Sequence, residues 1–141
     1  MYRVVLDTNI IEAALRSSDG ASAELLRLAV SGKLKPLATP ALFLEYEEVV
    51  KRPEQRLVHG LELEQLDEFL AALATVCEPV KLNYQWRPQL KDAADEMVLE
   101  AAINGRAQAI ATFNMRDFQP AAGLFGLDIL RPGEVLRSLR S

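Results

Sequence analysis

The feature that most constrains the fold is an alternation of short apolar runs with longer amphipathic stretches. The chain opens on such a run, Val4-Val5-Leu6, which has the length and composition of a buried strand. Four further strands are expected, at 37–38, 76–82, 109–112 and 127–130. Strands that alternate with helices pair in parallel and are covered by helices on both faces. The sequence therefore predicts an α/β fold with a central parallel sheet of about five strands.

Turn and capping residues predict where the helices begin and end. Asp19-Gly20 separates a first helix from a second. Thr39-Pro40 supplies an N-cap followed by proline at the first helical position, and Pro53 ends the helix that follows. Pro79 places the third strand at a sheet edge. Helices are expected at about 21–30, 40–52, 63–75 and 92–104 and after Pro132. Because no linker or repeat interrupts this pattern, we expect residues 1–141 to form a single domain.

Composition limits the classes of site that the chain can build. Cys77 is the only cysteine, so no intramolecular disulfide can form, and a reducing, cytoplasmic location is expected. His59 is the only histidine, which excludes a zinc site of the usual His/Cys type and leaves oxygen ligands for any metal. No apolar run approaches the roughly 18 residues of a membrane span, and no secretory signal is apparent. The net charge of −4 disfavours bulk attraction to nucleic acid, although bound divalent cations would offset it locally.

Polar side chains follow two of the predicted strands at the point where each strand ends. Asp7 comes directly after the first strand, with Thr8 and Asn9 opening the next helix, and Asn114 and Asp117 follow the fourth strand. In parallel sheets, ligands bind beyond the carboxyl ends of the strands. Each residue also has a simpler interpretation, in which Asp7 or Thr8 caps a helix and Asn114 caps a turn.

Asp95 adds a carboxylate from a third segment. At helical spacing it projects with Val98, Leu99 and Ala102 toward the core. A buried carboxylate needs a positive partner, which could be an arginine or a metal ion. The alternative is a capping pair with Asp92 as N-cap, and both interpretations can hold at once.

A fourth candidate lies in the helix expected at 40–52, which carries three glutamates. Glu48 is opposite the apolar stripe and is expected to be solvated, whereas Glu45 and Glu47 border the two sides of the stripe. Helical periodicity does not decide between Glu45 and Glu47.

Four motifs in their order and spacing resemble the PIN domain over essentially the full length. They are Asp7-Thr8-Asn9-Ile10, Leu44-Glu45-Tyr46, Asp92-Ala93-Ala94-Asp95, and Thr112-Phe113-Asn114 with Asp117-Phe118. Within this family the chain is most similar to the VapC-like toxin ribonucleases of prokaryotic toxin–antitoxin pairs.

The resemblance implies a three-layer α/β/α sandwich and a Mg²⁺- or Mn²⁺-dependent endoribonuclease. It implies catalytic roles for Asp7, Glu45, Asp95 and Asp117, and so favours Glu45 over Glu47. The implied metal ligands are Asp7, Glu45, Asp92, Asp95, Asn114 and Asp117. The implied substrate-binding residues are Thr8, Asn9 and Arg116. Many family members carry an aspartate at the position of Asn114, so the second metal site would either rely on Asp117 or be weak. A homodimer, an RNA substrate and a cognate antitoxin are the implied partners.

Basic and aromatic residues near the predicted edge could contact RNA. The candidates for phosphate contacts are Arg16, Lys51, Arg52, Arg87 and Arg116. Tyr84 and Trp86 could stack on bases.

Three other classes of protein place an acidic residue after the first strand or share the fold. A haloacid-dehalogenase-like phosphatase needs a second aspartate two residues after the first, where this chain has Asn9, so this class is disfavoured. A response-regulator receiver needs an aspartate and a lysine at places where Asn83 and Arg131 are the nearest residues, so this class is excluded by its chemistry. The strongest rival is a catalytically silent binding module, because Asn114 replaces a carboxylate.

Overall fold

The computed structural model describes residues 1–83, 90 and 92–140, so the predicted contacts of Tyr84, Trp86 and Arg87 lie outside the described residues. The strands are β1 (Tyr2–Leu6), β2 (Leu34–Ala38), β3 (Glu78–Pro79), β4 (Ala109–Ala111) and β5 (Asp128–Leu130). The helices are α1 (Thr8–Arg16), α2 (Ala21–Val30), α3 (Pro40–Lys51), α4 (Pro53–His59), α5 (Leu63–Val76), α6 (Ala93–Gly105), α7 (Met115–Phe125) and α8 (Pro132–Arg140).

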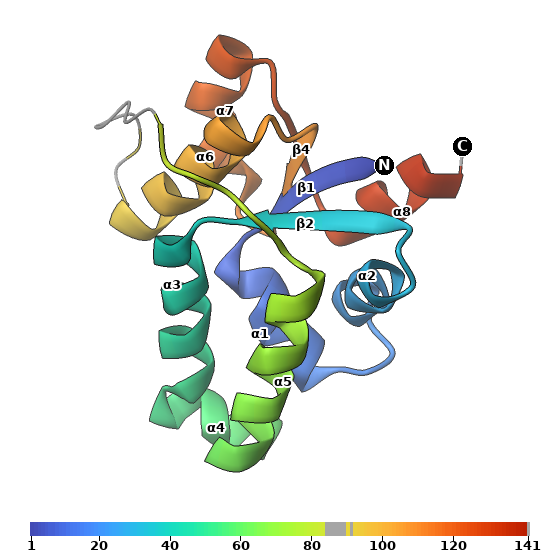
Figure 1. Ribbon diagram of the computed structural model, residues 1–141, viewed down its shortest axis with the longest axis vertical. Coiled ribbons are helices and arrows are strands. Elements are labelled where there is room, and N and C mark those ends of the chain that lie inside the picture. The colour runs from blue at the N-terminus through green and yellow to red at the C-terminus, as the bar shows by residue number, and fades with distance from the viewer. Residues whose placement is uncertain (84–89, 91, 141) are drawn as a thin grey trace.

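The strands form one parallel sheet in the order β3-β2-β1-β4-β5. Helices α6 and α7 lie on one side of β1 and β2, and α1, α2 and α5 lie on the other, which gives the expected three layers (Figure 1). The chain leaves β1 for β2 on one side and returns through α6 to β4 on the other. The carboxyl ends of β1 and β4 therefore flank a topological switch point, where ligands bind in open α/β sheets.

The core fixes the strands and helices that surround this point. Val4, Val5 and Leu6 are fully buried, and the buried Tyr46 of α3 donates its hydroxyl hydrogen to the carbonyl oxygen of Leu6. Helix α6 ends at Gly105, close to the sheet. A side chain is excluded at this position because a Cβ would come within 2.9 Å of side-chain carbons of Leu37 and Val80. Close packing of this kind fixes the C-terminal end of α6 against β2 and the residue that follows β3.

Several predicted boundaries are confirmed, and two strands are wrong in extent. The second strand, expected at 37–38, is Leu34–Ala38, since its residues from Leu34 onward already pair with β1. Thr39 caps α3 through its side chain, with Pro40 in the first turn, and α2 has the predicted bounds. The third strand, expected at 76–82, is only Glu78–Pro79, because α5 continues to Val76 and Pro79 has no backbone N–H to extend the ladder. As predicted, this strand is at the edge of the sheet.

Two helices were not predicted. Pro53 ends α3 as expected but also opens α4, with Arg52 as the residue between the two helices. Helix α7 occupies residues that the sequence indicated only as a turn, and it contains Pro120. No helix in the described ranges combines the length and the apolar character needed to cross a membrane.

Candidate active site

Asp7 is buried at the carboxyl end of β1, where it is the N-cap of α1. One carboxylate oxygen, Oδ1, accepts a hydrogen bond of 2.7 Å from the backbone N–H of Thr8. The other, Oδ2, accepts a hydrogen bond of 2.7 Å from the hydroxyl of Thr112 at the end of β4. Burial raises the pKa of Asp7, these donors lower it, and the charge of Asp117 raises it. The capping role is thus confirmed. The hydroxyl of Thr8 also donates to Oδ1 at 3.4 Å, whereas Oδ2 keeps a lone pair for a further ligand.

Thr112 connects this carboxylate to the turn that precedes α7. Its hydroxyl oxygen also accepts the backbone N–H of Asn114 at 2.9 Å and the amide of Asn9 at 3.5 Å. The side-chain oxygen of Asn9 accepts the backbone N–H of Phe113 at 3.4 Å. Asn9 and Thr112 therefore hold the β1–α1 and β4–α7 connections together. Sequence reasoning included Thr112 in a motif but gave it no role, because its contact with Asp7 depends on the strand register.

Asp95 lies in the first turn of α6 and is 9% exposed, which confirms that it faces inward. Its pKa is raised to about 7, first by burial and then by the charges of Asp7, Asp92, Asp117 and Glu96. A carboxylate is desolvated here among like charges, so its ionised form is unfavourable at neutral pH.

The remaining acidic and polar candidates surround these two carboxylates. Asp92 caps α6, with its side chain accepting the backbone N–H of Ala94 at 2.7 Å, as the capping interpretation predicted. Asp117 is exposed in the first turn of α7, and its charge acts on both Asp7 and Asp95. Asn114 is the N-cap residue of α7, as the simpler interpretation expected, but its side chain makes no capping hydrogen bond. Arg116 is exposed beside it.

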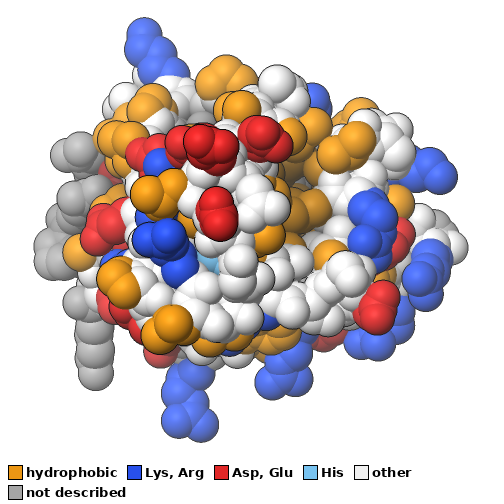
Figure 2. Space-filling view, turned by 90° about the horizontal axis from the view of Figure 1, so that it is seen from below, with side chains coloured by type: hydrophobic (Ala, Val, Ile, Leu, Met, Phe, Trp, Pro, Cys, Tyr) orange, Lys and Arg blue, Asp and Glu red, His pale blue; other side chains and the backbone are white. Residues whose placement is uncertain are grey.

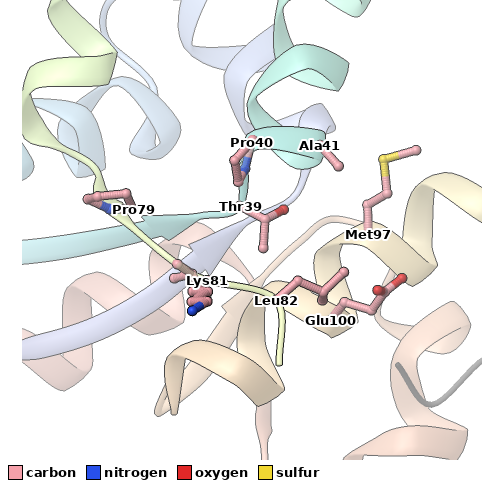
Figure 3. A pocket seen from close by; sticks show the side chains of 9 residues that line it. Thr39, Pro40, Ala41, Pro79, Lys81, Leu82, Met97 and Glu100 are labelled. Carbon is pink, nitrogen blue, oxygen red and sulfur yellow. The ribbon is translucent and has the colours of Figure 1, made fainter. Parts of the chain in front are cut away.

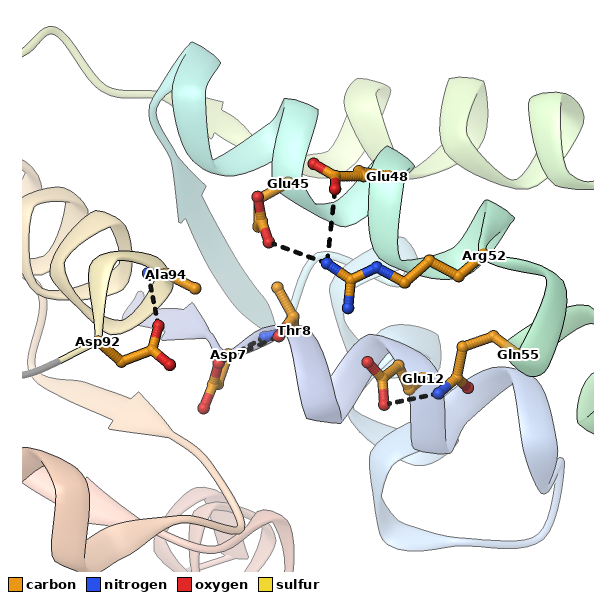
Figure 4. Close-up of polar contacts among 9 residues, drawn as sticks. All are labelled: Asp7, Thr8, Glu12, Glu45, Glu48, Arg52, Gln55, Asp92 and Ala94. Carbon is orange, nitrogen blue, oxygen red and sulfur yellow. Dashed lines mark hydrogen bonds and ion pairs between the residues drawn. The ribbon is translucent and has the colours of Figure 1, made fainter.

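The structure separates the three glutamates of α3 by their partners. Glu47 pairs with Lys51 at 3.3 Å, and Lys51 also pairs with Asp67 of α5 at 2.7 Å. Glu45 has a largely buried side chain and lies 3.9 Å from Arg52, whereas Glu48 is exposed, as predicted, and lies 3.5 Å from Arg52. Figure 4 shows Glu45 and Arg52 projecting toward the start of α1, on the side where Asp7 lies. Four aspartates thus interact electrostatically, while Glu45 interacts with an arginine.

Oxygen ligands of this kind fit Mg²⁺ or Mn²⁺ in their chemistry, because both ions prefer carboxylates. Within the described ranges, no three acidic, histidine or cysteine side chains are already grouped closely enough to hold a metal ion. Ion binding at these residues would therefore require side-chain movement, and Asp92 and Asp117 are exposed. His59 is elsewhere: its Nδ1 accepts the N–H of Leu61, so its Nε2–H donates to the carbonyl of Val50.

A separate cavity of about 700 Å³ lies between the start of α3, the chain after β3 and α6 (Figure 3). Its lining is mainly apolar and includes Met97, Leu82 and one carboxylate, Glu100. Among the described residues, none of the predicted site residues lines this cavity.

The chain after β3 explains why two glutamates of α6 are buried. Glu96 and Glu100 are buried, although their spacing places them away from the Asp95 face. The carboxylate of Glu96 accepts the backbone N–H of Leu90, and Asn104 accepts the backbone N–H of Asn83 at 2.8 Å. A second face of α6 is therefore covered by chain that follows the edge strand.

Against this geometry, a comparison with known families gives a clear assignment. Residues 3–116 match the model of the PIN domain, and the chain belongs to that family. PIN domains are generally nucleases and typically use divalent metal ions. A search of curated proteins found no match.

Proposed function

We propose that this chain is an endoribonuclease that hydrolyses RNA phosphodiester bonds with Mg²⁺ or Mn²⁺. The observation that carries the proposal is the burial of two carboxylates, Asp7 and Asp95, within electrostatic range of each other and of Asp117. In agreement with this, burial and the neighbouring charges raise the pKa of Asp95 to about 7. Carboxylates held together at this cost in free energy are typical of cation sites, because a bound divalent ion removes the repulsion.

In this proposal the chain's own residues have distinct tasks. Asp7, fixed by Thr8 and Thr112, is the anchoring ligand, and Asp95 is the second. Asp92, Asp117, Glu45 and the side-chain oxygen of Asn114 are further ligands that can turn toward the ion. Thr8, Asn9 and Arg116 position the RNA. When bound, the divalent ion activates water and stabilises the leaving oxygen of the phosphodiester.

The test is cleavage of a labelled single-stranded RNA in the presence of Mn²⁺ or Mg²⁺, with a chelator as the control. Asp7→Asn keeps the size and the capping acceptor of the side chain but removes its charge. We expect it to abolish cleavage while the melting temperature changes little. Wild-type activity in this variant would exclude the assignment.

A second function, binding without catalysis, has one observation in its favour. Asn114 stands where many family members carry an aspartate, and no group of three ligands is preformed in the described part of the chain. RNA or protein binding without cleavage under any divalent ion would select this alternative.

The biological setting follows from the resemblance to VapC-like toxins. We propose a cytoplasmic homodimer that is inhibited by a small antitoxin. Purification of the tagged chain from its native host, with mass measurement of co-purifying proteins of low mass, tests the antitoxin. Sedimentation or light scattering tests the dimer.

A further inference from the structure

Arg52 occupies an unusual place in the chain, between two helices and beside the candidate active site. It is the C-cap of α3 and the N-cap of α4, in an extended backbone conformation. From there its side chain extends back along α3, and its Nη2 lies 3.9 Å from Glu45 and 3.5 Å from Glu48. Figure 4 shows the guanidinium between these glutamates and the start of α1.

Arg3 shows how a structural arginine in this protein is satisfied. It makes two hydrogen bonds to the carboxylate of Glu78, at 2.7 and 3.1 Å, and one of 2.7 Å to the carbonyl of Gly105. Within the described ranges Arg52 makes no hydrogen bond of this quality, and both of its ion pairs use the same terminal nitrogen. Most of the five N–H donors of its planar guanidinium group are therefore available to a further ligand.

Arg52 is close enough to the candidate site to share an electrostatic neighbour with Asp7. Burial raises the pKa of Glu12 in α1, the charges of Arg16 and Arg52 lower it, and the charge of Asp7 raises it. Arg52 and Asp7 thus act on the same carboxyl group. By contrast, Lys51, the residue before it, is paired with Glu47 and Asp67.

A single arginine is important for RNA binding when the surface has no broad basic patch. On the face shown in Figure 2, acidic and basic side chains are interspersed, and most of the basic ones lie at the rim. The net charge of the chain is −4. Attraction of an anionic strand to this site therefore depends on individual arginines.

We propose that Arg52 binds a backbone phosphate of the RNA next to the metal-binding carboxylates and, in doing so, releases Glu45. The loose ion pairs with Glu45 and Glu48 are exchanged for two parallel N–H bonds to phosphate oxygens, the geometry that guanidinium groups favour. Glu45 is then free to turn toward the cation. This inference rests on the proposed function and adds a positioning residue to the same site.

Binding of RNA and of the cation then becomes coupled through one side chain. Without Arg52, RNA loses a phosphate contact, but Glu45 no longer has a competing cation. Arg52→Gln should therefore weaken RNA binding and leave Mn²⁺ binding equal or tighter. A purely structural role in joining α3 to α4 predicts no such divergence, since a loosened site would bind both ligands less well.

The experiment measures binding of a labelled single-stranded RNA in chelator, where no cleavage occurs, at several salt concentrations. The variants are Arg52→Gln, Arg52→Lys and the control Arg27→Gln, which removes an exposed arginine that pairs with Glu24 at 3.0 Å. Arg27 lies in α2, away from the residues of the candidate site. Mn²⁺ affinity is measured separately by titration without RNA.

We expect Arg52→Gln to weaken RNA binding about 3- to 10-fold and to reduce the slope of log affinity against log salt by about 0.7, the value for one phosphate contact with a single strand. Arg52→Lys should keep that slope but bind RNA less tightly than wild type, and Arg27→Gln should match wild type. Mn²⁺ affinity of Arg52→Gln should be unchanged or up to about 5-fold tighter, the range for loss of an exposed ion pair.

Equal RNA binding by Arg52→Gln and Arg27→Gln would overturn the inference, and so would parallel losses of RNA and Mn²⁺ affinity. Failure of the wild type to bind RNA in chelator would also count against it. The proposed function fails separately, if wild-type protein binds RNA through Arg52 but never cleaves it with Mn²⁺ or Mg²⁺.

Discussion

Replacement of Asp95 by asparagine tests whether repulsion among carboxylates destabilises the metal-free protein. Asp95 has an ordinary pKa of 3.8 and a folded-state pKa of about 7. Below pH 4 the carboxyl group is protonated in both the folded and the unfolded chain, so it has no effect on stability. Above pH 4 the unfolded chain releases this proton more readily than the folded chain does. Stability is therefore lost as the pH rises from about 4 to about 7, and the loss is constant above that.

The size of the effect follows from the pKa shift. One pKa unit corresponds to about 1.4 kcal/mol, so the full shift sets a ceiling of about 4 kcal/mol. Water reaches part of this edge of the sheet, where Asp92 and Asp117 are exposed, and screening reduces the effect to about 1–2 kcal/mol. We expect Asp95→Asn to gain that much relative to wild type between pH 4.5 and pH 8, or about 3–6 °C in melting temperature.

The assay is thermal or urea unfolding across this pH range in chelator, repeated with Mn²⁺. Asp19→Asn, in the exposed turn before α2, is the matched control and should show no relative gain. Mn²⁺ should stabilise wild type more than Asp95→Asn, because the variant lacks a ligand. A relative stability of Asp95→Asn that is independent of pH, or equal stabilisation of both proteins by Mn²⁺, would refute the reasoning.

Three further substitutions test other parts of the site and fold. Thr112→Val removes the hydroxyl that donates to Asp7 at 2.7 Å, so we expect a loss of about 1–2 kcal/mol in urea unfolding and weaker Mn²⁺ binding in titrations. Gly105→Ala places a Cβ within 2.9 Å of core side chains and should cost about 1–2 kcal/mol in urea unfolding without changing Mn²⁺ affinity. Glu45→Gln should weaken Mn²⁺ binding and RNA cleavage, whereas Glu47→Gln, which loses only the exposed pair with Lys51, should leave both unchanged; equal effects would remove Glu45 from the site.

Much of the fold could be predicted from local sequence because the relevant signals are local. Val4-Val5-Leu6 and the Thr39-Pro40 cap specify their elements through burial and backbone chemistry, and both elements form as expected. Helix α7 was missed because Pro120 interrupts the sequence that follows Asn114, although the helix accommodates it. The short length of β3 depends on where α5 ends, and the amphipathic pattern of α5 does not mark that boundary sharply.

The candidate site could be predicted only as far as strand ends and helix faces specify it. The position of Asp7 after β1 and the inward direction of Asp95 required only a strand end and a helical period. The bond from Thr112 to Asp7 required the β1–β4 register, in which Leu6 is opposite Ala111, and no local pattern encodes that pairing. The partner of Glu45 was equally hidden, because it depends on Pro53 starting a new helix directly after Arg52.

These two unpredicted contacts hold their carboxylates in different ways. Thr112 and Thr8 stabilise the charge of Asp7 with hydrogen bonds, so this carboxylate is oriented before any ligand arrives. Arg52 contacts Glu45 only through a loose ion pair, which a stronger anion can replace at little cost. For Asp95, burial and the like charges around it outweigh any such stabilisation from the described residues, and its pKa is raised to about 7. In the proposed complex a divalent cation relieves Asp95 and an anionic strand occupies Arg52. Each ligand would then remove an obstacle to the other, so we expect the two to bind with positive cooperativity.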